Sequence, residues 1–143
     1  MDQPTVLVLE PDDQIRQLLI SLLERSGYAV TATTRGDEAA IAFGMREFDV
    51  FIIDISLRAS VLERGARRGL GFLHLLEQSR PDVLPRVIVT SAIAVQQLAQ
   101  RIPTVCRVLQ KPFDIDELRN AIAICARRAQ KRSAAEVAAL PYR

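Results

Sequence analysis

The segment Phe48-Asp49-Val50-Phe51-Ile52-Ile53-Asp54 decides the fold of this 143-residue chain. Its four apolar residues, Val50–Ile53, follow one another without alternating with polar residues. This pattern is typical of a strand that is buried on both faces of a parallel sheet. The segment therefore predicts a central parallel strand that carries the carboxylate of Asp54 at its carboxyl end.

Four further apolar runs predict strands, namely Val6–Leu9, Tyr28–Ala32, Val87–Val89 and Val108–Leu109. Between the runs lie helical patterns, the clearest of which places Ile15, Leu18, Leu19, Leu22 and Leu23 on one stripe. Weaker patterns predict helices that open at Asp37, contain Gly71–Leu76, cover Val95–Gln100 and contain Leu118–Cys125. The alternation predicts a doubly wound, flavodoxin-like (βα)5 fold with five parallel strands.

Composition indicates one compact domain, since 143 residues with 49% hydrophobic residues can bury a core without further support. We expect a unit at 1–132, with an Arg-rich insertion at about 56–69, and a C-terminal tail at 133–143. A loop of about 2–6 residues is usual where the insertion stands. Its unpaired arginines predict an exposed excursion, either a solvated loop or a contact for an acidic partner.

The charge pattern argues against a nucleic-acid binder, because the net charge is only +2. The basic run 127–132 is expected to complement the negative end of the last helix. No aromatic residues interleave with this run and no helix-turn-helix pattern follows it, so no DNA-binding domain is expected.

Export and membrane insertion are not expected either. The N-terminus has no basic region, and no stretch approaches the roughly 18 apolar residues of a membrane span. Cys106 and Cys125 are too few for a disulfide framework and are expected to be small buried thiols. The chain is therefore expected in a reducing cytoplasm.

The carboxyl ends of four predicted strands bring reactive groups to one edge of the sheet. Glu10 follows the first strand, Asp54 the third, Thr90 the fourth and Lys111 the fifth. Neighbouring carboxylates favour a Mg²⁺ ion, which also bridges to phosphate oxygens. An ammonium and a hydroxyl that face the metal suit a transferring phosphoryl group. The edge therefore predicts phosphoryl chemistry on Asp54.

At these positions the chain resembles the response-regulator receiver family of two-component signalling, from about Thr5 to Arg128. The resemblance rests on Val6-Leu7-Val8-Leu9-Glu10-Pro11-Asp12-Asp13, Phe48–Asp54, Thr90-Ser91-Ala92 and Lys111-Pro112-Phe113 in this order. It implies that Asp54 is the phosphoacceptor of a histidine kinase or phosphotransfer protein. It also implies a Mg²⁺ site formed by Glu10, Asp12, Asp54 and the Ser56 carbonyl. Lys111 would pair with the phosphoryl group, and Thr90 would donate a hydrogen bond to it, or Ser91 if the register shifts by one. The Lys111-Pro112 peptide bond would be cis.

Three departures from the family pattern bear on function. Pro11 stands where the family places a second acid, which predicts weaker Mg²⁺ binding, with Asp12 as a substitute ligand. Val108 replaces a commonly aromatic residue that reports the phosphorylated state, and the loop after Asp54 is longer than usual. We expect Asp13 to cap the helix that follows, and His74 to be a surface residue.

The resemblance implies a stand-alone response regulator that switches its interaction with an unidentified output protein. The alternative is a pseudo-receiver, a protein-binding module that is not phosphorylated, which Pro11 and Val108 favour. An enzyme is not expected, because hydrolases with an Asp nucleophile carry a second acid two residues later, and Ser56 stands there. Whether the chain is a monomer or a homodimer stays open.

Overall fold

The fold is a five-stranded parallel sheet, as predicted. A computed structural model describes residues 3–55, 69–92, 100, 102 and 104–141 of the chain. The strands are β1 (Thr5–Leu9), β2 (Ala29–Thr33), β3 (Val50–Asp54), β4 (Val87–Ser91) and β5 (Arg107–Gln110). Their order across the sheet is β2-β1-β3-β4-β5, and every neighbouring pair is parallel. This order places β3, which ends at Asp54, in the middle of the sheet.

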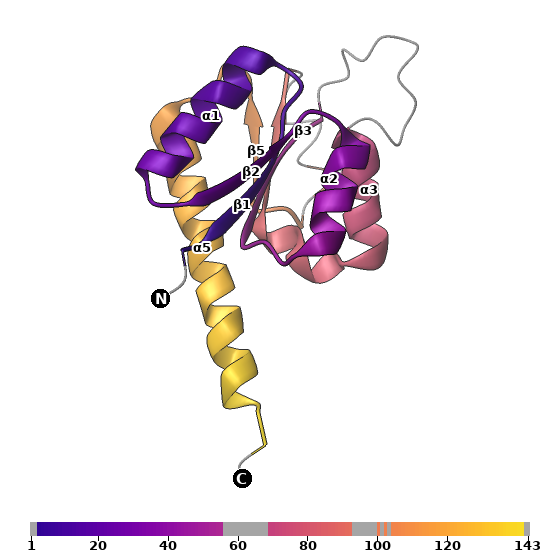
Figure 1. Cartoon of the computed structure of the whole chain (residues 1–143), viewed down its shortest axis with the longest axis vertical. Helices are drawn as coiled ribbons and strands as arrows, with labels where there is room; N and C mark the ends of the chain where they lie inside the picture. The colour runs from indigo at the N-terminus through magenta and orange to yellow at the C-terminus, as the bar shows by residue number, and fades with distance from the viewer. Residues whose placement is uncertain (1–2, 56–68, 93–99, 101, 103, 142–143) are drawn as a thin grey trace.

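The sheet separates two hydrophobic layers, because successive side chains of a strand point to opposite faces. On β1, Val6 and Val8 pack toward α1 (Asp13–Arg25) and α5 (Ile115–Ala138). Leu7 and Leu9 pack toward α2 (Gly36–Met45) and α3 (Gly69–Ser79) on the other face. Figure 1 shows these two helical layers on either side of the strands. Burial on both faces explains the unbroken apolar runs of β1, β3 and β4.

The N-cap of the first helix lies one residue earlier than predicted. Asp12, not Asp13, is the N-cap of α1, and its side chain accepts a hydrogen bond from the backbone N–H of Ile15 at 3.0 Å. Asp13 is the first helical residue and forms an ion pair with Arg16. The prediction that Asp13 caps this helix is therefore wrong, because the backbone leaves the helix at Asp12.

The connection between β3 and β4 contains α3 and the short 3-10 helix η2 (Pro81–Arg86). Helix α3 begins at Gly69, the last residue of the predicted insertion. The other residues of the insertion, 56–68, lie outside the described residues. The predicted fourth helix also lies outside them, apart from residue 100. His74 is exposed on α3, which confirms the prediction of a surface histidine.

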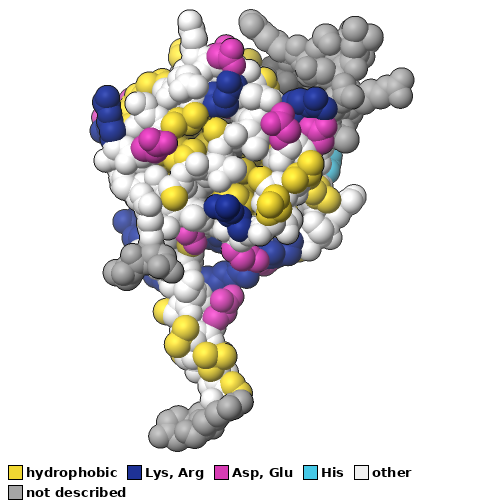
Figure 2. Space-filling model, viewed as in Figure 1, with side chains coloured by type: hydrophobic (Ala, Val, Ile, Leu, Met, Phe, Trp, Pro, Cys, Tyr) yellow, Lys and Arg dark blue, Asp and Glu magenta, His cyan; other side chains and the backbone are white. Residues whose placement is uncertain are grey.

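Helix α5 is longer than the sequence indicated. It runs for 24 residues to Ala138, so the predicted unit boundary at residue 132 falls inside it. The basic run 127–132 lies within the helix and not at its end, so the prediction that it complements the negative end is wrong. Beyond this run the helix projects from the body, and Figure 2 shows hydrophobic side chains along the projection. Val137 and Leu140 are each 67% exposed there.

Within the described ranges, no helix combines the length and the apolar character needed to cross a membrane.

Candidate functional site

Strand register brings the predicted site residues to one end of the sheet. Asp54, the last residue of β3, lies opposite Thr90 of β4. Glu10 directly follows β1, and its N–H donates to the carbonyl of Thr33 at 3.0 Å. Lys111 directly follows β5, and its N–H donates to the carbonyl of Ser91 at 2.7 Å. Carboxyl ends of adjacent parallel strands thus hold two acids, a hydroxyl and an ammonium together.

The ammonium of Lys111 bridges the two acids. Its Nζ donates to Oε1 of Glu10 at 2.5 Å and lies 3.1 Å from Oδ1 of Asp54. The Lys111-Pro112 peptide bond is cis, as predicted. Among the described residues of the site, two carboxylates share one ammonium, an arrangement that favours a further cation or donor.

The site is buried although it is charged. Glu10 is 2% exposed and Asp54 is 5% exposed. Burial raises the pKa of the Glu10 carboxyl above its ordinary value, the hydrogen bond from Lys111 opposes this shift, and the negative charge of Asp54 adds to it. Ionisation of Glu10 therefore costs free energy in the folded protein, and a bound cation would reduce that cost.

The hydroxyl of Thr90 lies beside the acceptor carboxylate. Its Oγ1 donates to Oδ1 of Asp54 across a long contact of 3.5 Å, and Thr90 is 2% exposed. Ser91, the alternative for this position, is fully buried at the end of β4. Val108 is half-buried on β5 and packs against the α2 and α3 layer. The hydroxyl of Thr90 is therefore placed to donate to a group on the acceptor carboxylate.

The turn after β1 is occupied by the helix cap. The N–H of Asp12 donates to Oε2 of Glu10 at 3.2 Å, while its carboxylate caps α1. Arg16 ties this turn down, since its Nη1 donates to the carbonyls of Glu10 and Pro11 at 3.1 and 3.4 Å. Sequence reasoning did not single out Arg16. The carboxylate of Asp12 is thus engaged with the backbone of α1.

The donor set decides whether Mg²⁺ fits this edge. Glu10 and Asp54 supply hard carboxylate oxygens, and Mg²⁺ is commonly bound by one or two carboxylates with water and phosphate as the remaining ligands. No group of three or more His, Cys, Asp or Glu side chains with metal-binding spacing occurs in the described part of the chain. The predicted ligand Ser56 lies outside it. The residues present therefore fit a metal held by two carboxylates.

Gly69 is a further residue of the site that sequence reasoning missed. It is the first residue of α3, and a β-carbon built on it would lie 1.7 Å from the backbone oxygen of Asp54. No side chain is compatible with this approach, so glycine lets α3 begin directly against the end of β3. The sequence signal for this role was the position of Gly69 between the Arg-rich segment and the helical pattern that follows it.

Comparison with known proteins identifies the family of this chain. The family model of the response regulator receiver domain matches residues 6–123. The chain belongs to the response regulator receiver domain family. Receiver domains are signalling modules of two-component systems, and this assignment confirms the resemblance found from the sequence.

Individual relatives agree with the receiver assignment. The transcriptional activator protein PfeR of Pseudomonas aeruginosa is 32% identical over 119 residues, which are 80% of this chain and 35% of PfeR. This receiver domain thus spans about a third of that relative. The receiver domain of the Francisella response regulator 1452 matches with a TM-score of 0.72 at 27% identity, over 87% of this chain and 98% of that one. NtrX from Brucella abortus shares the fold, with a TM-score of 0.76 at 22% identity, over 99% of this chain and 31% of NtrX.

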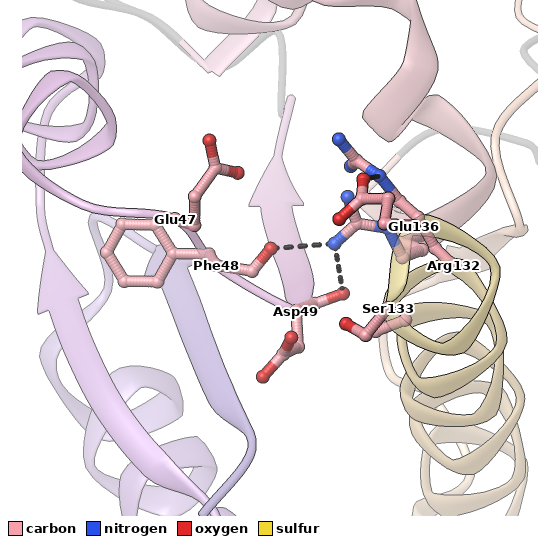
Figure 3. Close-up of a pocket in the computed structure, with 8 residues that line it drawn as sticks. Glu47, Phe48, Asp49, Arg132, Ser133 and Glu136 are labelled. Atoms are coloured by element: carbon pink, nitrogen blue, oxygen red, sulfur yellow. Dashed lines mark hydrogen bonds and ion pairs between the residues drawn. The ribbon is translucent and has the colours of Figure 1, made fainter. Parts of the chain in front are cut away.

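A pocket of about 290 Å³ lies at the opposite, amino end of the sheet of this receiver domain (Figure 3). Arg86, which is 4% exposed, donates from Nη1 to the carbonyls of Phe48 and Asp49 at 2.7 and 2.8 Å. On its α5 wall, Arg132 pairs with Glu136 at 3.0 Å. Ligands of doubly wound sheets bind beyond the carboxyl ends of the strands. This pocket therefore lies where α5 packs against the segment before β3. The candidate site is the opposite edge of the sheet, which carries Asp54.

Proposed function

We propose that Asp54 of this receiver domain accepts a phosphoryl group from a histidine kinase or phosphotransfer protein. The observation that carries the proposal is the ammonium of Lys111, which lies 3.1 Å from Oδ1 of Asp54 in a buried site. A buried cation next to an acceptor carboxylate offsets the negative charge that a phosphoryl group brings. The phosphorylated form would then bind its output partner differently.

The transfer itself needs few groups. A carboxylate oxygen of Asp54 attacks phosphorus, a P–O bond forms, and the bond from phosphorus to the donor nitrogen breaks with its electron pair leaving on the donor. Lys111 neutralises a phosphoryl oxygen, and Thr90 donates its hydroxyl to another. Glu10 and Asp54 would hold Mg²⁺ together with the Ser56 carbonyl, whereas the carboxylate of Asp12, the other ligand that the sequence suggested, caps α1. When bound, the ion supplies positive charge to the phosphoryl oxygens.

One observation favours the alternative of a pseudo-receiver. Pro11 stands at the position of a second acid, and the neighbouring carboxylate of Asp12 accepts the Ile15 N–H at 3.0 Å. A metal held by two carboxylates binds more weakly than one held by three. In this alternative the fold binds a protein partner without being phosphorylated.

Phosphorylation by a small donor separates the two functions. The protein is incubated with acetyl phosphate and Mg²⁺, and its intact mass is measured beside the Asp54→Asn variant and the exposed control Asp116→Asn. We expect the wild type and the control to gain one phosphoryl group and Asp54→Asn to gain none. A gain that survives Asp54→Asn would refute the assignment of Asp54, and no gain in the wild type would favour the pseudo-receiver.

A further inference from the structure

One arginine of α1 contacts the turn that joins β1 to this helix. Nη1 of Arg16 donates to the carbonyls of Glu10 and Pro11 at 3.1 and 3.4 Å. The backbone N–H of Arg16 donates to the carbonyl of Asp12, the N-cap residue, at 2.9 Å. The side chain, which is only 15% exposed, therefore extends back toward the start of α1 and binds the two residues before the N-cap.

The two residues that Arg16 binds lie between the sheet and the helix. Glu10 follows the last residue of β1, and Pro11 precedes the N-cap of α1. Buried peptide groups outside regular structure need other hydrogen-bond partners, and Glu10 is 2% exposed. Proline has no N–H with which to stabilise the turn. The guanidinium of Arg16 supplies donors to both carbonyls, and these bonds restrict the path of the turn.

The path of this turn determines where the carboxylate of Glu10 points. Oε2 of Glu10 accepts the N–H of Asp12 at 3.2 Å, a bond across two residues that forms only in a suitable turn conformation. Oε1 accepts Nζ of Lys111 at 2.5 Å, and the same Nζ lies 3.1 Å from Oδ1 of Asp54. Each carboxylate oxygen has two lone pairs, so Glu10 can accept these bonds and still coordinate a cation. Contacts thus connect Arg16, through the turn and Glu10, to the acceptor carboxylate.

We propose that Arg16 is a positioning residue for the Mg²⁺ site, because it fixes the turn after β1 and thereby the orientation of the Glu10 carboxylate. The inference rests on the function proposed above, in which Glu10 and Asp54 hold the cation. Pro11 increases the importance of this role, since a site with two carboxylates depends on each of them more than a site with three. Residues that hold a metal ligand in place typically change the metal affinity by about 10–100-fold when they are removed.

Charge and positioning predict opposite effects for the loss of Arg16. Its guanidinium is a positive charge next to the turn, and a positive charge weakens the binding of a cation by repulsion. Asp13 pairs with Nη2 of Arg16 at 2.5 Å and offsets part of this charge. If electrostatic repulsion alone mattered, removal of the arginine would tighten Mg²⁺ binding. Weaker binding after its removal is therefore the result that positioning predicts and repulsion does not.

Isothermal titration calorimetry of the whole chain with Mg²⁺ tests this role. We expect the Kd of Arg16→Ala to be about tenfold higher than that of the wild type. Arg16→Lys should recover part of the loss, because lysine keeps the charge and can still donate to a carbonyl. Two controls should keep a Kd close to that of the wild type: Arg25→Ala, which removes an exposed arginine of the same helix, and Asp13→Ala, which removes only the ion pair. A Kd of Arg16→Ala equal to or below that of the wild type would overturn the proposal.

A weakened helix is the competing explanation, and Asp12→Ala controls for it. This variant removes the side chain that caps α1 but keeps the backbone N–H that Glu10 accepts. Urea midpoints measure how far each variant is destabilised. We expect Asp12→Ala to lose stability and keep its Mg²⁺ affinity, whereas Arg16→Ala loses affinity. An equal rise in Kd for both variants would show that the effect follows from the loss of helix stability and not from positioning.

A second measurement needs no metal. Amide hydrogen exchange of the Asp12 N–H, followed by NMR in buffer without Mg²⁺, should be several-fold faster in Arg16→Ala than in the wild type, while the amides of β3 keep their protection. Unchanged exchange at Asp12 would overturn the proposal whatever the metal affinity. The wild type alone reports on the underlying function: if it binds no Mg²⁺ and gains no phosphoryl group from acetyl phosphate, both proposals fail. If it does both and the Kd of Arg16→Ala is unchanged, only the role of Arg16 fails.

Discussion

The α-carbon of Gly69 approaches the backbone carbonyl of Asp54 so closely that a β-carbon would lie 1.7 Å from the oxygen and 2.8 Å from the carbonyl carbon. The neighbouring atoms are backbone atoms at the end of the central strand, so they cannot rotate away as a flexible side chain would. Any side chain at position 69 must therefore shift either α3 or the residue that carries the acceptor carboxylate.

We predict that Gly69→Ala lowers the free energy of unfolding by about 1–3 kcal/mol, the usual cost of overpacking. It should also slow phosphorylation by acetyl phosphate, because relief of the clash displaces Asp54. Gly44→Ala is the matched control: Gly44 has open space around its α-carbon within α2, so alanine should stabilise by about 0.5–1 kcal/mol. Urea midpoints and intact mass measure both effects. A Gly69→Ala protein as stable as the wild type would disprove the contact.

Lys111 is predicted to matter more for chemistry than for folding. It belongs to neither hydrophobic cluster, yet its ammonium bridges Glu10 and Asp54. Lys111→Ala should slow phosphoryl uptake by roughly 100-fold, as removal of a buried charge-stabilising donor does. The exposed Lys131→Ala serves as the control and should leave uptake unchanged. Rates come from a time course of intact mass, and equal rates for both variants would contradict the role of Lys111.

The substitution Pro11→Asp should tighten Mg²⁺ binding. It restores a carboxylate next to Glu10, and an added negative oxygen ligand strengthens binding of a cation that dehydrates reluctantly. Isothermal titration calorimetry of the wild type and the variant measures the change in Kd. An unchanged Kd would mean that the position does not face the metal.

The substitution Asp12→Ala separates helix capping from metal binding. Since the Asp12 carboxylate accepts the Ile15 N–H, its loss should cost about 0.5–2 kcal/mol of stability and leave the Mg²⁺ affinity close to that of the wild type. Asp114→Ala is the matched control, because Asp114 caps α5 in the same way. If Asp12→Ala abolishes Mg²⁺ binding while Asp114→Ala does not, Asp12 is a ligand after all.

The buried Glu10 should make stability depend on pH. Its folded pKa lies above the ordinary value of 4.5, so the cost of ionising it appears as pH rises past the unfolded pKa and is complete above the folded pKa. Glu10→Gln removes this cost. The variant should be more stable than the wild type near pH 7, and the gain should vanish below about pH 4. Urea midpoints across this range test it, with the exposed Glu24→Gln as control. A gain that is independent of pH would exclude ionisation as its cause.

The sequence by itself determined the parallel sheet and the set of residues at its carboxyl edge. Unbroken apolar runs such as Val50–Ile53 record burial on both faces, which is a local property of each strand. A residue that directly follows such a run, as Glu10 and Lys111 do, must lie at a strand end whatever the packing. Parallel pairing then places all these ends on one side.

Only the tertiary structure decided how these residues meet. Lys111 contacts Glu10 across 101 positions in the chain, and no local pattern indicates that one ammonium bridges two acids. The contact of Gly69 with Asp54 depends on where α3 begins relative to the end of β3. The ion pair of Arg132 in α5 with Asp82 in η2, at 3.1 Å, depends on how those two elements pack. The physical reason is that periodicity along a chain records burial, whereas distances between side chains from different elements depend on how those elements pack.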